Sequence, residues 1–261
     1  MCLILFSYRR HPAYPLIIAA NRDEFYERPT APASFWDDHP DILAGRDLQD
    51  GGTWLGITRS GRMAAITNYR DPRTLKDNAP SRGELVSEFL RSDATPDEYI
   101  QEIQPDADRY NGFNLLMGDG RGFFHFSNMT GVFSEILPGT HGISNHLLDT
   151  PWPKVERGRS RLGDTLSGRD PSPDELFDIL ADTSHPDDRE LPDTGIGIEW
   201  ERLLSSVFIR SDIYGTRSST VILVDQEGTV RFIERSFTSG PAPFQTVQFE
   251  LQIPAGAYAP R

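Results

Sequence analysis

Two short apolar runs open the chain, at residues 2–8 and 16–20. The segment between them, His11-Pro12-Ala13-Tyr14-Pro15, is rich in residues that favour turns. Apolar runs of this length joined by a turn segment predict an antiparallel β-hairpin. The two ends far from the turn lie side by side in a hairpin, so residues 20–23 are expected beside residue 2.

Turn residues also divide the next part of the chain. A second hairpin is predicted for residues 53–58 and 63–67, because Arg59-Ser60-Gly61-Arg62 between them contains a turn glycine. Residues 27–52 hold three prolines and three glycines, and this composition predicts mostly loop.

Apolar residues adopt helical spacing after residue 80. Ser81 and Glu84 resemble a capping box ahead of apolar residues spaced for a helix between 85 and 90. Thr95, followed by Pro96, has the features of an N-cap and first turn. Two helices are therefore predicted here, lying together on one face of a sheet.

The rest of the chain alternates between strands and helices. Strands are expected at 113–117, 123–126, 132–137, 219–225, 230–236 and 245–253, helices at 152–166 and 174–183, and a surface loop at 184–197. Strands linked mainly by hairpins, with helices in blocks between them, predict antiparallel sheets covered by helical layers. The expected fold is α+β, a four-layer αββα sandwich forming one domain over residues 1–261.

Composition narrows the functional classes. A net charge of −13, from 39 acidic and 26 basic residues, disfavours general binding to nucleic acid or to anionic membranes. No stretch approaches the roughly 18 apolar residues of a membrane span, and residues 2–6 lack the basic start of a signal peptide. The single cysteine excludes an internal disulfide and fits a reducing compartment, so a cytoplasmic protein is expected.

Metal and phosphate motifs are absent from the sequence. The six histidines show neither HxH nor HExxH spacing. Glycine clusters at 51–52 and 118–122 match no phosphate-binding loop and are interpreted as turns. Neither a metal nor a cofactor is therefore expected from motifs.

The only cysteine is residue 2, directly after the initiator methionine. Cysteine is small enough for Met1 to be removed, which would leave a thiol and a free α-amine on one residue. An α-amine of pKa ~7.7–8.0 can accept the proton of a thiol of pKa ~8.5, and this pairing activates N-terminal nucleophiles. Position alone leaves a second interpretation, a small buried side chain that opens a strand.

Polar residues after the second strand are candidate partners of Cys2. Asn21, Arg22 and Asp23 are expected beside the sulfur if the hairpin forms. A carboxylate at Asp23 would orient the α-ammonium or relay its proton. Because successive strand residues point to opposite faces, Arg22 and Asp23 are not both expected to face Cys2. The alternative is a solvated polar turn.

Three more polar residues lie next to predicted strands, namely Asn68, Asn145 and Arg217. Asparagine amides donate hydrogen bonds to an oxyanion, and an arginine holds a carboxylate or steadies developing charge. The alternative for each is an ordinary turn or surface position.

Ordered motifs along the chain resemble a known family. They are Met1-Cys2-Leu3-Ile4, Ala20-Asn21-Arg22-Asp23-Glu24, Gly45-Arg46-Asp47-Leu48, Gly51-Gly52-Thr53-Trp54-Leu55-Gly56, Thr67-Asn68-Tyr69-Arg70, Ser81-Arg82-Gly83-Glu84-Leu85-Val86, Tyr110-Asn111-Gly112-Phe113-Asn114-Leu115, Gly142-Ile143-Ser144-Asn145 and Tyr214-Gly215-Thr216-Arg217-Ser218-Ser219-Thr220. The series resembles the NRDE family, also called the Transport and Golgi organisation 2 family, over essentially the whole chain.

The chain is more distantly similar to cysteine N-terminal-nucleophile hydrolases, the penicillin V acylase and bile salt hydrolase group. This resemblance implies the αββα fold, Cys2 as nucleophile with its α-amine as base, and Asp23 near that amine. It implies Asn68 and Asn145 as oxyanion or amine partners and Arg217 as a polarising group.

Ligand contacts are expected from residues within the same motifs, namely Asn21, Arg22, Trp54 and Tyr69. The acylases place an arginine three residues before the aspartate, a position that Ala20 fills here. The nearby arginine of this chain, Arg22, is expected on the opposite face of the strand.

The resemblance leaves two classes of function open. One is an amidase-type hydrolase acting on linear carbon–nitrogen bonds or on a related thioester. The other is a non-catalytic carrier of haem or of an acyl or lipid ligand, in line with the family's association with Golgi and secretory organisation, lipid metabolism and haem handling. Aromatic residues are expected to line either pocket: Phe6, Tyr26, Phe35, Trp36 and Trp54.

Overall fold

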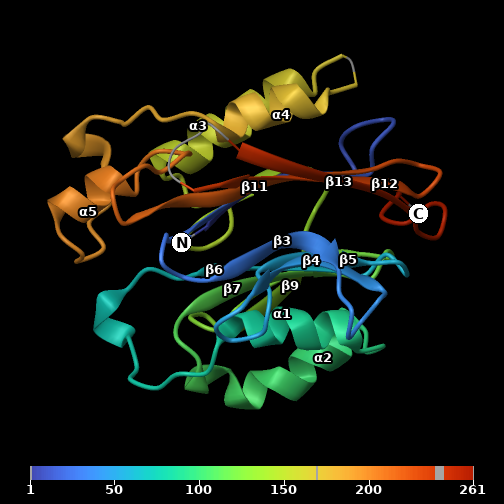
Figure 1. The fold of residues 1–261 in the computed structure, drawn as a ribbon, viewed down its shortest axis with the longest axis horizontal. Coiled ribbons are helices and arrows are strands. Elements are labelled where there is room, and N and C mark those ends of the chain that lie inside the picture. Colours follow the sequence, from blue (N-terminus) through green and yellow to red (C-terminus); the bar gives the residue numbers. More distant parts are fainter. Residues whose placement is uncertain (1, 169, 239–243, 261) are drawn as a thin grey trace.

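The computed structural model describes residues 2–168, 170–238 and 244–260. Two antiparallel sheets face each other in it (Figure 1). The six-stranded sheet has the order β10-β1-β2-β11-β12-β13, and the seven-stranded sheet runs in chain order from β3 to β9. Their bounds are β1 (Cys2–Tyr8), β2 (Leu16–Phe25), β3 (Thr30–Phe35), β4 (Ile42–Asp47), β5 (Leu55–Thr58), β6 (Met63–Asn68), β7 (Phe113–Gly118), β8 (Phe123–Ser127), β9 (Val132–Glu135), β10 (Gly139–Ile143), β11 (Tyr214–Val224), β12 (Thr229–Phe237) and β13 (Phe244–Gln252).

Helices cover the outer face of each sheet (Figure 1). The helices are α1 (Arg82–Arg91), α2 (Pro96–Ile103), α3 (Pro153–Thr165), α4 (Pro173–Leu180) and the short α5 (Ile198–Leu203), with 3₁₀ turns η1 (Pro72–Thr74), η2 (Gln104–Arg109) and η3 (Asp188–Glu190). The first two helices lie under the seven-stranded sheet, and α3 and α4 lie over the other sheet. The α+β fold with four layers is confirmed.

Strand β1 shows how the sequence builds two cores from one strand. Cys2, Ile4 and Phe6 belong to the core between the sheets, while Leu3 and Leu5 pack beneath α3 and α4. Side chains alternate along a strand, so an unbroken apolar run buries both faces.

The two predicted N-terminal hairpins are confirmed, but the loop expected at residues 27–52 is wrong. That segment contains β3 and β4, paired antiparallel with a register shift between Ala31 and Ser34. Pro32 lies in the shift, and β3 is an edge strand, so the missing N–H of proline breaks no necessary ladder bond.

Smaller differences occur after residue 137. Strand β10 and helix α5 were not predicted, and the helix expected to reach residue 183 ends at Leu180. Within the described ranges, no helix is long and apolar enough to cross a membrane.

Candidate functional site

Cys2 lies at one end of the space between the sheets. It pairs in register with Arg22 on β2, within the range 20–23 that the hairpin predicted, and only 8% of the residue is exposed. A cavity of about 760 Å³ opens beside it. Met1, whose removal the nucleophile hypothesis requires, lies outside the described residues.

A register-matched row of residues forms the floor of this cavity. Each residue of the row pairs with the next across the six-stranded sheet, and all of them line the cavity: Cys2, Arg22, Ser218, Ser236 and Gln245. Paired residues of antiparallel strands point to the same face, so the sheet itself places the thiol and the guanidinium together. The opposite wall comes from β3, β4, β6, the two residues before β5 and the start of α1.

The Cys2 thiol is held in its protonated form. Burial raises its pKa, and the nearby charge of Asp23 adds to the rise. The charge of Arg22 and a hydrogen bond from the backbone N–H of Asp23 act in the other direction without overcoming burial. A nucleophilic Cys2 therefore needs a base that removes its proton.

Arg22 lines the cavity with a side chain that is 11% exposed. Its Nη2 lies 3.5 Å from Asp47 Oδ2 and 3.9 Å from Glu24 Oε2. Its Nη1 has no hydrogen-bond partner among the residues that the structure describes. The expectation that Arg22 lies on the strand face opposite Ala20 is wrong, because residues two apart share a face and Ala20 lies in the core between the sheets.

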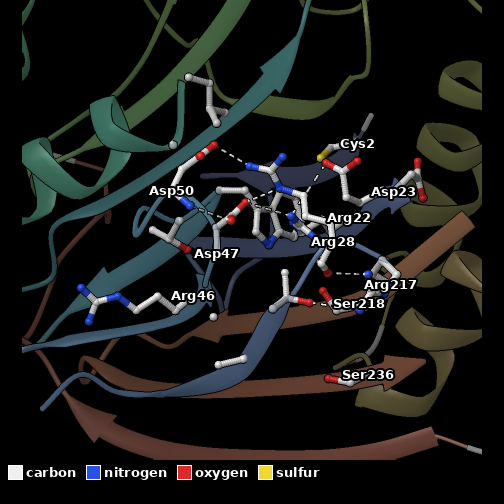
Figure 2. A pocket seen from close by; sticks show the side chains of 18 of the residues that line it. Cys2, Arg22, Asp23, Arg28, Arg46, Asp47, Asp50, Arg217, Ser218 and Ser236 are labelled. Atoms are coloured by element: carbon white, nitrogen blue, oxygen red, sulfur yellow. Dashed lines mark hydrogen bonds and ion pairs between the residues drawn. The ribbon is translucent and has the colours of Figure 1, made fainter. Parts of the chain in front are cut away.

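Arg28 closes the cavity on the side of β4 (Figure 2). Its Nε lies 2.6 Å from Asp47 Oδ2, and its Nη2 lies 2.6 Å from Asp50 Oδ2. Asp47 also accepts the backbone N–H groups of Gln49 and Asp50 through Oδ1. These contacts hold the turn after β4 against the turn after β2.

Arg217 lines the cavity, but its guanidinium group binds backbone carbonyl oxygens. Its Nη1 donates to the carbonyl oxygens of Phe25, Tyr26 and Arg28, at 2.8 to 3.1 Å. It lies at the β-bulge between Thr216 and Ser218, where an extra residue re-aims the side chain. In this arrangement Arg217 holds the turn that carries Arg28.

Asp23 is 1% exposed, and its Oδ1 accepts a 2.7 Å hydrogen bond from Thr216 Oγ1. Burial raises the pKa of this carboxyl, and the positive charge of Lys154 opposes the rise. The sequence motifs did not indicate this buried cation.

The two asparagines lie one behind the other. Asn68 lines the cavity, and its carbonyl oxygen accepts a 3.0 Å bond from Asn145 Nδ2. Asn145 is completely buried, and its Oδ1 accepts from Arg70 Nη2 and Ser144 Oγ. Ser144 Oγ also lies 3.0 Å from the carbonyl oxygen of Cys2, so this network fixes the start of β1.

Two predicted ligand contacts face away from the cavity. Asn21 donates from Nδ2 to the carbonyl oxygens of Leu180 and Val207, on the side of the helices. Tyr69 Oη pairs with His146 Nε2 at 2.8 Å. Trp54 does line the cavity, as expected.

The other aromatic residues expected in the pocket are not among those that line it. They are Phe6, Tyr26, Phe35 and Trp36. Phe6 and Trp36 belong to the core between the sheets, and Phe35 packs against that core.

Arg82 and Glu234 are among the cavity residues that were not predicted from the sequence. Arg82 opens α1 and donates from Nη1 to the carbonyl oxygen of Gly112; burial lowers its pKa, while the nearby Cys2 charge raises it. Glu234 is 3% exposed, accepts from the backbone N–H of Ala33, and has its pKa raised by burial. Arg82 lies within one of the family motifs, Ser81-Arg82-Gly83-Glu84-Leu85-Val86, whereas no sequence motif includes Glu234.

The layers and the position of Cys2 define a protein with the fold of the N-terminal-nucleophile hydrolases. A Caenorhabditis elegans N-acylethanolamine-hydrolyzing acid amidase ortholog is similar at a TM-score of 0.51 and 10% identity, over 85% of this chain and 92% of that chain. A mutant conjugated bile acid hydrolase from Clostridium perfringens reaches a TM-score of 0.50 and 8% identity, over 95% and 92%. At these identities the likeness shows the fold alone.

The sequence defines the family. The family model described as Transport and Golgi organisation 2 matches residues 1–239. The Transport and Golgi organization protein 2 homologs of Bos taurus and Homo sapiens are 41% and 40% identical, each over 97% of this chain and over 99% and 100% of their own length. The chain therefore belongs to the Transport and Golgi organisation 2 family.

Proposed function

We propose that the chain is a cysteine hydrolase of the N-terminal-nucleophile class, which cleaves an amide or a related acyl bond through Cys2. The observation that carries the proposal is the row of the six-stranded sheet that places the only cysteine beside Arg22 on the floor of a cavity of about 760 Å³. That volume lies within the range of small-molecule sites.

The first chemical step uses the α-amine of a chain that begins at Cys2. This amine takes the thiol proton, and the thiolate attacks the carbonyl carbon of the substrate. The carbon–nitrogen bond of the tetrahedral intermediate then breaks, and the leaving nitrogen takes the proton back from the α-ammonium. Water, deprotonated by the same amine, hydrolyses the thioester and releases the acid and Cys2.

The surrounding residues support these steps in different ways. Arg22 and Arg82 place positive charge near the sulfur, which opposes the effect of burial on the thiol pKa without overcoming it. Asp23 orients the α-ammonium, and Asn68 is the amide that lines the cavity and can donate to the oxyanion. Asn145 acts indirectly, because its amide already binds the Asn68 carbonyl oxygen.

Arg217 acts indirectly too, by holding the turn that carries Arg28. The backbone carbonyls that occupy its Nη1 leave the direct contact with substrate to Arg22. We take the reaction to occur in the cytoplasm, because a chain with a single cysteine forms no internal disulfide, as is usual in a reducing compartment.

Intact mass spectrometry tests the proposal. The purified protein is treated with a β-lactone, and its mass is compared with that of Cys2→Ala treated in parallel. One acyl group on the wild type and none on the variant supports nucleophilic attack by Cys2. Labelling that survives Cys2→Ala contradicts it.

A second candidate is a carrier that uses the same cavity for haem or for an acyl or lipid ligand. The raised pKa of the Cys2 thiol favours this candidate, because a neutral thiol is a poor nucleophile. A carrier would serve the transport and Golgi organisation for which the relatives are named.

Thermal unfolding separates the carrier from the hydrolase. A carrier gains stability as the ligand concentration rises, by about 2.7 kcal/mol at 100 times the dissociation constant. For a carrier, haemin or a long-chain acyl ligand shifts the melting temperature of the wild type and of Cys2→Ala equally. An absence of any shift in both proteins contradicts the carrier.

A further inference from the structure

The register-matched row crosses five strands, and its length follows from their pairing. Neighbouring strands of a sheet lie about 4.8 Å apart, so the four steps from Cys2 to Gln245 cover about 19 Å. Figure 2 shows the labelled members of the row one below another, namely Cys2, Arg22, Ser218 and Ser236. Ser236 is three steps, or about 14 Å, from Cys2. The cavity therefore extends along the row, with the thiol at one end.

Every member of the row has a polar side chain, although the row lies on the face between the two sheets. Side chains on such a face normally form an apolar core. Two residues further along β1 and β2, the same face does carry apolar residues of that core, Ile4 and Ala20. The row runs from the buried Cys2 to the exposed Gln245 on the edge strand β13. This arrangement is typical of a surface that contacts water or a polar ligand.

Part of the hydrogen-bonding capacity of the row is left unused by the protein. The side chains of Ser236 and Gln245 form no hydrogen bond with any residue in the described ranges. The same holds for Nη1 of Arg22. A ligand that displaces water from such groups without replacing its hydrogen bonds loses affinity. A plain hydrocarbon chain is therefore a poor match for the row.

The two sheets meet beside the row and confine a ligand to it. Glu234 lies two residues from Ser236 on β12, and its Oε1 accepts the backbone N–H of Ala33 on β3 at 2.7 Å. A Cβ added to Gly45 on β4 would lie 3.7 Å from Glu234 Oε2. Because Glu234 fills the space between the sheets there, the open path from the thiol follows the row.

We propose that the acyl group of the substrate is an extended chain that carries oxygen atoms and lies along this row, with Ser236 as a specificity-determining residue. The inference rests on the proposed function, because the acyl group is the part that stays on the Cys2 sulfur after the amine leaves. A guanidinium only donates hydrogen bonds, and hydroxyl and side-chain amide groups donate as well. Oxygen acceptors on the chain, such as ether or hydroxyl oxygens, therefore match every member of the row beyond the thiol.

Two p-nitroanilides of equal chain length test the proposal. One carries a decanoyl group, and the other carries a 3,6,9-trioxadecanoyl group, in which ether oxygens replace three methylene groups. The ratio kcat/KM is measured for both anilides with the wild type, Ser236→Ala, Ser236→Thr and Ser134→Ala. Ser134 is the matched control, because it is an exposed serine on β9 outside the cavity.

Ser236→Ala lowers kcat/KM for the trioxadecanoyl anilide about fivefold, as expected for the loss of one hydrogen bond, and does not lower it for the decanoyl anilide. Ser236→Thr keeps the hydroxyl and retains the wild-type preference, and Ser134→Ala changes neither value. A fall by the same factor for both anilides, or no fall for either, overturns the inference.

Binding of the two free acids separates this inference from the proposed hydrolase. If the wild type turns over neither anilide, the hydrolase is contradicted, and calorimetry then measures both acids with Cys2→Ala alone and combined with Ser236→Ala. The added substitution raises the dissociation constant of 3,6,9-trioxadecanoate about fivefold and leaves that of decanoate unchanged. An equal effect on both acids, no effect, or no binding of either acid overturns the inference.

Discussion

Breaking the buried ion pair between Arg70 and Glu201 tests how strongly this pair stabilises the fold around the site. Arg70 and Glu201 meet at 2.6 Å with side chains that are 5% and 4% exposed. Glu201→Gln preserves the shape but turns an amide N–H₂ either toward Arg70 or toward the donors of Thr194. Arginine cannot give up its proton, so the variant leaves a buried cation without its counter-charge.

The expected loss is large. Unit charges about 4 Å apart interact by about 4 kcal/mol at an effective dielectric constant of about 20. Removing one partner of a buried ion pair costs about 3–5 kcal/mol of the free energy of unfolding, which agrees with that value. Urea unfolding measures the loss as a lower midpoint with an unchanged slope.

The chain offers a matched control of the same bond length. Arg202 and Asp188 also meet at 2.6 Å, but their side chains are 44% and 55% exposed. Asp188→Asn is expected to lower stability far less, because water screens an exposed pair. Equal losses for Glu201→Gln and Asp188→Asn would refute the argument that burial makes the Arg70 pair strong.

Three further predictions concern the thiol, the backbone and pH. Arg22→Met removes a charge that favours the Cys2 thiolate, so alkylation of Cys2 at pH 7 slows about tenfold; an unchanged rate would contradict this. Gly52→Ala places a Cβ 2.6 Å from the backbone of Gly83 and lowers the free energy of unfolding by about 1–3 kcal/mol. Gly163→Ala lies in open space on α3 and raises the free energy of unfolding by up to about 1 kcal/mol, and chemical denaturation checks the sign of both changes. Burial lowers the pKa of His125 from 6.5 to about 4, so its neutral form stabilises the fold above the unfolded pKa of about 6.5, and that stability is lost as pH falls toward 4. His125→Gln flattens the pH dependence of the melting temperature in this window, and an identical pH profile would count against the assignment.

The local pattern of apolar and turn residues was enough to predict much of the fold and one neighbourhood in the site. The apolar runs and the turn between them determined the first hairpin, and its geometry placed residues 20–23 beside Cys2, although not the exact partner, Arg22. The helices expected after Ser81 and Thr95 were also found. Thr95 forms a capping box with Glu98, whereas the box expected for Ser81 and Glu84 is wrong, because the Ser81 side chain makes no capping hydrogen bond. These features depend on neighbours in sequence, so one chain suffices to predict them.

The features that the sequence did not predict depend on packing between segments that lie far apart in the chain. Pro32 signalled a loop because the sequence does not show that its strand lies at a sheet edge. Asn145 and Arg217 have the right chemistry for a site, but only the three-dimensional structure shows which carbonyl groups their side chains already bind. The charge of Lys154 on α3 lowers the pKa of Asp23 from a different layer of the sandwich, and no spacing in the sequence indicates this effect.

Intact mass before and after treatment with a β-lactone decides whether Cys2 is an N-terminal nucleophile. A purified chain that lacks Met1 and gains one acyl group is expected, with no gain in Cys2→Ala. A chain that retains Met1, or a processed chain whose Cys2 stays unmodified, would show that Cys2 is not such a nucleophile and would favour a ligand carrier on a hydrolase fold.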